Sequence, residues 1–288
     1  MTIVAAKKCS SYQLDELAEK LDNLLQQLGG LEKFISRGDR VLFKTNLLMG
    51  KAPEAAVTTN PELIRVLARK VKELGAEVII ADSPGGPFNE TLLKRAYKKS
   101  GLYDMAEEED IKLNYNVDSK KVEYSEGNIN KSFQLVSYLE DADLIINLPK
   151  LKTHGLTMYT GGVKNLFGCI PGVLKAEYHL RIQSVYDFSR MLNDLAGLVK
   201  PDLTIMDAVV GMEGEGPSNG KPRNFNYLLA STSPYYLDLA AVRLMGIKPE
   251  ENVPSIKAAI DDKIIKKEEL EVKGDQLLPY TNVDIPKI

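Results

Sequence analysis

Two histidines and four lysines are concentrated in one segment of the sequence. His154 and His179 are the only histidines of the chain, and residues 150–179 also hold Lys150, Lys152, Lys164 and Lys175. An imidazole exchanges protons near neutral pH, and lysine ammonium groups bind anions as point charges. Segment 150–179 is therefore the first candidate for a functional centre, with proton transfer and anion binding as its expected chemistry.

Glycines in the same segment predict a backbone site for an anion. Gly161 and Gly162 allow the backbone to approach a ligand closely, so the N–H groups of residues 160–165 could cradle an anion while Lys164 pairs with its charge. A surface loop with solvated lysines is the alternative, and the apolar residues that would anchor the segment argue against it. For His179 alone, a surface histidine is as well supported as a ligand residue.

Polar residues follow the predicted strands at the point where each strand ends. Four apolar runs, 41–43, 77–82, 143–148 and 203–210, predict buried strands. The polar residues at their carboxyl ends are Lys44, Asn46, Asp82, Ser83, the segment 147–154 and Asp207. Because ligands of open parallel sheets bind beyond the carboxyl ends of the strands, we expect these side chains to converge. Helix capping or turn formation explains the aspartates and the serine equally well when each is taken singly.

The elements around these strands predict the fold. Segment 60–75 has Asn60 as its N-cap, Pro61 at the first helical position and Gly75 as its stop. It joins two predicted strands, and such a strand–helix–strand unit is typical of a parallel sheet. Further helices are predicted at 14–28, 90–100, 184–198 and 234–245, with another strand at 226–231.

The sequence therefore predicts an α/β fold, an open mostly parallel sheet with helices on both faces. We expect residues 1–288 to form a single domain. Within it, the polar segment 110–140 is predicted as an insertion or a smaller second lobe, with strands that each have one wet face.

A glycine-rich stretch at 211–220 carries the carboxylates Glu213 and Glu215. Carboxylates support acid chemistry or the binding of hard cations, so Glu213 is a candidate ligand residue. A flexible lid with glycine hinges is an equally supported alternative. Cys169 is more typical of a small buried apolar residue than of a nucleophile.

Composition and charge argue against several classes of protein. The net charge is −3 and the basic residues are spread along the chain, so nucleic acid is not an expected partner. No segment has the apolar length of a membrane helix or of a signal peptide, and we expect a cytoplasmic protein without a membrane partner. The two cysteines, Cys9 and Cys169, cannot by themselves form a disulfide framework or hold an iron–sulfur cluster.

The sequence resembles a known family, domain of unknown function 362 (DUF362), over residues 44–246. The motifs are KTNLL with TTNPEL, GAEVIIADSPGG, INLPKLKTH, GGVKNLFGCIPG, His179 and IMDAVVGMEGEGPSNG. The resemblance implies an association with iron–sulfur chemistry, because many members carry ferredoxin-type cysteine clusters, commonly at the carboxyl end. This sequence ends at Ile288 without one, so a cluster would need a separate ferredoxin-like partner or a second copy in a homodimer.

A shorter resemblance concerns residues 154–179. His154, Gly161-Gly162, Lys164, Pro171-Gly172 and His179 are similar to a segment of nickel-dependent lactate racemase. This resemblance implies that His154 is the acid/base and that Lys164 faces a nickel-pincer-like cofactor or an anion. It also implies that His179 is a metal ligand.

Three functions compete on these grounds. The first is an enzyme with racemase-like isomerase or oxidoreductase chemistry on a small anionic molecule, with His154 and Lys164 as its catalytic residues. The second is a redox accessory protein that acts with a separate iron–sulfur partner, and the third is a small-molecule binding protein without catalysis. The residues expected to bind the ligand are Lys44, Asn46, Asp82, Ser83, Lys152, Thr153, Gly161, Gly162, Asn165, Asp207 and Glu213.

Overall fold

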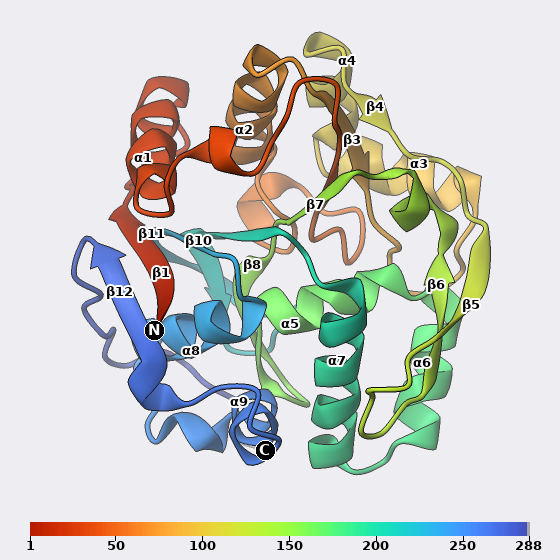
Figure 1. Cartoon of the computed structure of the whole chain (residues 1–288), viewed down its shortest axis with the longest axis vertical. Helices are drawn as coiled ribbons and strands as arrows, with labels where there is room; N and C mark the ends of the chain where they lie inside the picture. The colour runs from red at the N-terminus through yellow and green to blue at the C-terminus, as the bar shows by residue number, and fades with distance from the viewer. Residues whose placement is uncertain (287–288) are drawn as a thin grey trace.

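A ten-stranded sheet lies at the centre of the computed structural model, which describes residues 1–286 (Figure 1). Its strands are β1 Thr2–Lys8, β2 Arg40–Lys44, β3 Glu77–Ala81, β4 Lys112–Leu113, β7 Leu144–Asn147, β8 Lys150–His154, β9 Met158–Thr160, β10 Leu203–Glu213, β11 Lys221–Ser231 and β12 Leu270–Gly274. Their order is β12-β1-β11-β10-β7-β2-β3-β4, and β8 pairs with β10 and β9.

Parallel pairing places the carboxyl ends of three strands side by side at one edge of the sheet. β2 pairs in parallel with both β3 and β7, and Lys44 at the end of β2 lies opposite Ala81 and Asn147. The residues that follow these strands therefore leave the sheet at the same edge. The predicted mostly parallel sheet is confirmed, with antiparallel pairing of β11 to its neighbours and of β8 to β9.

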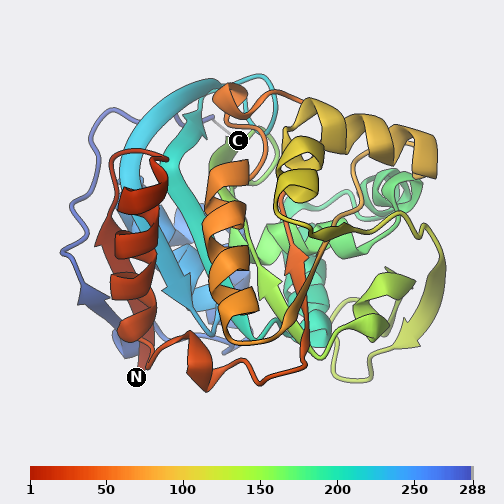
Figure 2. The same cartoon turned by 90° about the horizontal axis from the view of Figure 1, so that it is seen from above.

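Helices cover both faces of this sheet, as predicted. They are α1 Leu14–Gln26, α2 Pro61–Glu73, α3 Glu90–Lys99, α4 Leu102–Glu108, α5 Gly162–Asn165, α6 Gly172–Arg181, α7 Val185–Val199, α8 Pro234–Leu244 and α9 Pro254–Asp261. Side chains alternate between the faces of a strand. On β2, Val41 and Phe43 join the core beneath α1 to α4, whereas Leu42 packs on the opposite side with α7. Figure 2 shows α1 and α2 together on one face of the sheet.

Local sequence signals explain where α2 begins and ends. Asn60 accepts a hydrogen bond from the N–H of Glu62, and Pro61 occupies the first helical position, where no N–H is needed. The helix stops just before Gly75, whose φ of +82° is a conformation that favours glycine. Both predicted ends are confirmed, and the helix places the preceding loop, residues 45–60, at the carboxyl edge of the sheet.

The segment predicted as an insertion or lobe contains a two-stranded antiparallel sheet, β5 Ser119–Glu123 with β6 Ser132–Val136. Asp194 on α7 accepts hydrogen bonds from the N–H groups of residues 128–130 at the tip of this hairpin. Apolar residues of β6 share a core with α7. The hairpin is thereby attached to the helix that also covers the candidate site (Figure 1).

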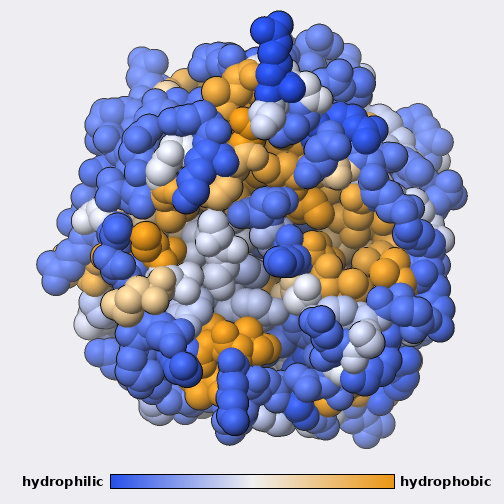
Figure 3. Space-filling view, in the orientation of Figure 1, coloured by the Kyte–Doolittle hydropathy of each residue, from blue (hydrophilic) through white to orange (hydrophobic). Residues whose placement is uncertain are grey.

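β8 and β9 form an antiparallel hairpin, so the alternative of a surface loop for the lysine-rich segment is wrong. β8 reads KLKTH, and its lysines are almost completely buried, because polar groups rather than water surround their amines. β10 likewise continues beyond the predicted end at residue 210 to Glu213, since both β8 and β11 pair with it. Most of the outline of the molecule is hydrophilic in the orientation of Figure 1, and apolar residues show mainly toward the recessed middle (Figure 3).

Candidate functional site

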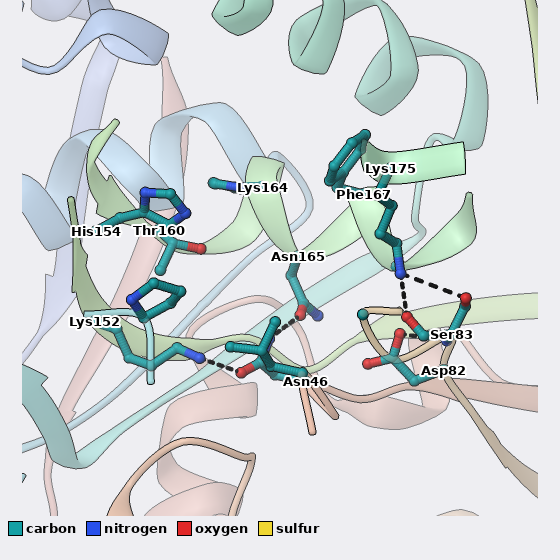
Figure 4. A pocket seen from close by; sticks show the side chains of 14 residues that line it. Asn46, Asp82, Ser83, Lys152, His154, Thr160, Lys164, Asn165, Phe167 and Lys175 are labelled. Atoms are coloured by element: carbon teal, nitrogen blue, oxygen red, sulfur yellow. Dashed lines mark hydrogen bonds between the residues drawn. The ribbon is translucent and has the colours of Figure 1, made fainter. Parts of the chain in front are cut away.

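A cavity of about 80 Å³ lies at the carboxyl edge of the parallel strands (Figure 4). Residues from the ends of β2, β3 and β8 and from α5 and α6 line it. The predicted site residues among them are Asn46, Asp82, Ser83, Lys152, His154, Lys164 and Asn165. Lys175, Phe167 and Pro217 also line the cavity and were not among the predicted ligand-binding residues. Half of the predicted site residues, seven of fourteen, therefore line one cavity.

Three lysine amines of this cavity have no carboxylate partner within residues 1–286. Lys152 donates to the Asn46 side-chain oxygen at 2.7 Å and to the Val57 carbonyl at 2.8 Å. Lys175 donates to the carbonyl of Ser83. The amine of Lys164 lies over two phenyl rings. Positive charge is thus gathered in a partly closed space in which no carboxylate of the described residues lies at ion-pair distance from these three amines.

Burial makes these lysines unusually easy to deprotonate. It lowers the pKa of Lys152 and of Lys175 to about 7, and that of Lys164 to about 8. Neighbouring lysine charges lower the pKa of Lys152 further, whereas the negative charge of Asp82 opposes the shift at Lys175. An anion bound in the cavity would reverse these shifts, because it stabilises the ammonium forms.

Lys44 and Asp82, both predicted to bind the ligand, form a buried ion pair with an N–O distance of 2.9 Å. The Asp82 carboxylate also accepts the N–H groups of Leu47 and Ser83, and it therefore organises the two strand ends. Gly168 has to lack a side chain here, since a Cβ would overlap the Asp82 carboxylate and the Lys44 amine. Asp82 lines the cavity, but its charge is already compensated by Lys44.

His154 lines the cavity as a neutral imidazole. Its Nδ1 accepts hydrogen bonds from the N–H groups of Leu156 at 3.0 Å and Thr157 at 3.3 Å, which assigns the ring proton to Nε2. Burial, followed by the charges of Lys164 and Lys152, lowers the pKa of His154 to about 2. The pKa of His154 therefore lies well below the near-neutral value expected of an imidazole. The ring is an N–H donor at neutral pH.

A chain of side-chain amides connects the strand ends behind the lysines. Asn46 accepts from Lys152 and donates to the Asn165 oxygen at 2.8 Å. Asn165 in turn donates to the Asn147 oxygen at 2.8 Å, and Asn147 donates to the carbonyl of Gly162. The chain joins β2, β7, β8 and α5, so it fixes the position of the Lys152 amine relative to the helix that carries Lys164.

The glycine cradle predicted at residues 160–165 holds a carboxylate of the protein itself. The N–H groups of Gly162 and Val163 donate to Asp238 on α8 at 2.5 and 2.9 Å, and the Tyr159 hydroxyl donates to it at 2.8 Å. Burial raises the pKa of Asp238 to about 7 despite these donors. Gly161 and Gly162 therefore position α5 and do not contact an external anion. A Cβ on Gly161 would overlap the Tyr159 hydroxyl.

Three other predicted ligand residues are committed to internal contacts away from the cavity. Asp207 is completely buried inside β10, where Lys150, Tyr12 and the N–H of Asn60 use its oxygens. Thr153 donates to the carbonyl of Gly214. Glu213 pairs with Arg223. These three predictions are corrected because β10 extends past Asp207 and because β8 packs against the β10–β11 turn.

His179 lies on α6 outside the cavity lining. Its side chain is exposed and its ring stacks on Phe188 at a centroid distance of 4.3 Å, where partial desolvation together with the charge of Lys164 lowers its pKa. Across residues 1–286, no three side chains of the His, Cys, Asp or Glu type are grouped to hold a metal ion. The cavity of about 80 Å³ is also far smaller than the ~300 Å³ typical of cofactor pockets. The described residues do not fit a nickel-bearing cofactor, and the metal role of His179 stays a prediction from resemblance.

Both cysteines are buried. Burial raises the pKa of Cys9 to about 11 and that of Cys169 to about 12, so neither presents a reactive thiolate at neutral pH. The prediction that Cys169 is a small buried apolar residue agrees with its place in the core beside α7. An iron–sulfur partner stays a prediction, and no contact of the described residues bears on it.

Sequence reasoning missed two residues that shape the site, for different reasons. Lys175 was recognised as part of the charged segment but was not assigned to the ligand, and its helical position four residues before His179 was the available signal. Asp238 lies 76 residues from Gly162 and has no local motif of its own. The only local signal for Asp238 was that an acidic residue stands on the otherwise apolar face of the predicted helix 234–245.

Comparisons with known proteins agree with this fold. The family model described as domain of unknown function (DUF362) matches residues 41–243. A thylakoid-associated protein of Synechocystis sp. is 34% identical over 262 residues, which cover 88% of this chain and 78% of that protein. The structure of the lactate racemase apoprotein from Thermoanaerobacterium thermosaccharolyticum has a TM-score of 0.50 at 17% identity. That likeness covers 86% of this chain and 58% of the racemase chain, and it concerns the fold alone.

Within residues 1–286, no helix is long and apolar enough to cross a membrane. The Synechocystis relative is called thylakoid-associated, which is said of that protein. A cytoplasmic location for this chain stays a prediction.

Proposed function

This chain belongs to the DUF362 family, and we propose that it is an enzyme that binds a small carboxylate or phosphate in the strand-end cavity and moves a proton on it. One observation carries the proposal. The amines of Lys152, Lys164 and Lys175 surround one small cavity, and no carboxylate within residues 1–286 pairs with them. Buried positive charges are costly unless they are paired, so a bound anion is the partner that this arrangement lacks.

The neutral state of His154 supports an anion rather than a cation as the ligand. An imidazole N–H donates a hydrogen bond to an anionic oxygen, as the lysine ammonium groups do. The volume of about 80 Å³ admits a molecule of a few heavy atoms, which favours a small acid over a nucleotide.

Proton transfer is supported by groups whose pKa values lie near the working pH. Lys164 and Lys175, with pKa values of about 8 and 7, can each hold or release a proton at neutral pH. His154 can stabilise negative charge that develops on a ligand oxygen, because its N–H donor is held in place by two backbone N–H groups on the other nitrogen.

Calorimetric titration of the wild-type chain with phosphate and with small 2-hydroxy and 2-oxo acids tests the binding. We expect Lys152→Met and Lys175→Met each to weaken binding by about tenfold or more, since each removes a positive charge next to the anion. Lys121→Met is the matched control, because Lys121 is 65% exposed on β5 and outside the cavity. Failure of the wild-type chain to bind any of these anions contradicts the proposal.

Proton exchange tests the enzymatic part. The acids that bind are incubated with the protein in D₂O, and loss of carbon-bound hydrogen is followed by NMR. We expect His154→Gln to slow the exchange by about 100-fold while anion binding changes little, because the substitution changes the donor and retains the lysines. Tight binding without exchange of any acid would identify the chain as a binding protein.

A further inference from the structure

Lys164 differs from the other two cavity lysines in its surroundings. The amines of Lys152 and Lys175 each donate to carbonyl or amide oxygens of the protein. For the Lys164 amine, residues 1–286 provide neither a hydrogen-bond acceptor nor a carboxylate at ion-pair distance. Its nitrogen lies 5.4 Å and 5.7 Å from the ring centroids of Phe167 and Phe188.

This difference divides the lysines into two kinds. Oxygens of the protein hold the amines of Lys152 and Lys175 in place, which suits the binding of an anionic group. The Lys164 amine instead lies near two aromatic rings, at distances close to the outer limit of cation–π attraction. No acceptor within residues 1–286 holds this amine, and with a pKa of about 8 part of it is neutral at neutral pH, which is the nucleophilic form of lysine.

We propose that Lys164 forms an imine with the carbonyl carbon of a small 2-oxo acid whose carboxylate is held by Lys152 and Lys175. The inference rests on the proposed function, because it uses the same anion site. His154 lines the same cavity, and its Nε2–H is the donor available to the carbonyl oxygen (Figure 4). Only a ligand with an anionic group next to a carbonyl engages both kinds of lysine. Its anionic group binds to Lys152 and Lys175, and its carbonyl carbon reacts with Lys164.

The step balances without an oxidant or a reductant. The Lys164 nitrogen donates its lone pair to the carbonyl carbon, and a carbon–nitrogen bond forms as the π electrons move to oxygen. The carbon–oxygen bond then breaks, and the oxygen leaves as water with the two hydrogens of the amine. Protonation of the imine nitrogen makes the neighbouring carbon–hydrogen bond acidic, which connects imine formation to proton transfer.

Reductive trapping tests the imine. The full chain is incubated with pyruvate and sodium cyanoborohydride, which donates hydride to an imine and fixes the adduct as a secondary amine. We expect an intact-mass increase equal to pyruvic acid less one oxygen atom, located at Lys164 by peptide mapping. Inorganic phosphate, as a competitor for the anion site, should reduce the labelling.

Lys164→Arg is the matched variant, because it keeps the positive charge and cannot form the imine. We expect trapping at this site to fall by about tenfold or more, while phosphate binding by calorimetry persists. Phosphate binding without an adduct in the wild-type chain overturns the imine and leaves the proposed function intact. Equal labelling of the wild type and the variant, or labelling spread over surface lysines, also overturns it. Absence of both phosphate and pyruvate binding overturns the proposed function itself.

Discussion

Lys152 and Lys175 show how burial changes the chemistry of an ordinary side chain. Each amine is held by uncharged oxygens, and each has a pKa of about 7 instead of its ordinary value of 10.5. His154 is driven in the same direction and is neutral at physiological pH. Without a ligand, the cavity therefore loses positive charge as the pH rises through neutrality, and an anion has to restore that charge when it binds.

Anion affinity should consequently fall as the pH rises. The pKa values of Lys152 and Lys175 are low in the free cavity and rise when an anion binds, so binding takes up protons above about pH 7. We expect phosphate or pyruvate binding to weaken by about tenfold per pH unit for each lysine that takes up a proton. Calorimetry in buffers of different ionisation enthalpy, at constant ionic strength, measures the proton uptake. Uptake close to zero at pH 8 to 9 would show that these lysines stay protonated in the free protein.

At the scale of elements, the site depends on how α5 is joined to the strand ends. Asn165 donates its amide hydrogens to the carbonyls of Lys44 and Thr45 and to Asn147, and its oxygen accepts from Asn46. All of these contacts lie at one edge of the sheet. The helix that carries Lys164 is therefore fixed by side-chain amides from two parallel strands.

Asn165→Asp tests this junction with a side chain of the same shape. The new carboxylate cannot donate, so the Asn147 oxygen loses its donor, the carbonyls of Lys44 and Thr45 each lose one of two donors, and all three face a negative charge. We expect the free energy of unfolding to fall by about 2–3 kcal/mol in urea titrations. Asn23→Asp, at an exposed position of α1, is the control and should change stability by less than about 0.5 kcal/mol. Equal effects of the two substitutions would argue against the junction.

At the scale of the whole molecule, Asp207 connects parts of the chain that are distant in sequence. Its oxygens accept from Tyr12 near the N-terminus, from Lys150 on β8 and from the N–H of Asn60 at the start of α2. The Tyr12 hydroxyl also accepts from Lys150 and from the N–H of Val210. This network explains why an aspartate that follows the pattern of a ligand residue is structural.

Tyr12→Phe should destabilise the protein through this network. Removal of the hydroxyl takes a hydrogen-bond acceptor from the Lys150 amine and from the Val210 N–H. It also takes a donor from the Asp207 carboxylate. We expect a loss of about 2 kcal/mol in the free energy of unfolding, with little change in phosphate binding. Tyr186→Phe serves as the control, because its hydroxyl donates to Asp261 at the surface. A Tyr12 variant as stable as the control would show that the network contributes no net stability.

The sequence by itself determined the parallel strands, the α2 cap with Asn60 and Pro61, and the edge at which Asn46, Asp82 and Lys152 meet. These features depend on local patterns, such as apolar runs, capping residues and the shared direction of parallel strands. The resemblance of the motifs to DUF362 was confirmed. It identifies the family but not an activity, because the domain is described as one of unknown function.

Only the tertiary structure decided which charged groups are free. Asp238 occupies the glycine cradle, Asp207 is taken by Lys150 and Tyr12, and Lys164 finds no acceptor among residues 1–286. The charge state of His154 was equally hidden, because its burial and the lysines around it arise from packing. The physical reason is that a residue's type fixes which interactions it can make, whereas long-range contacts fix which partners it finds and how much water it keeps.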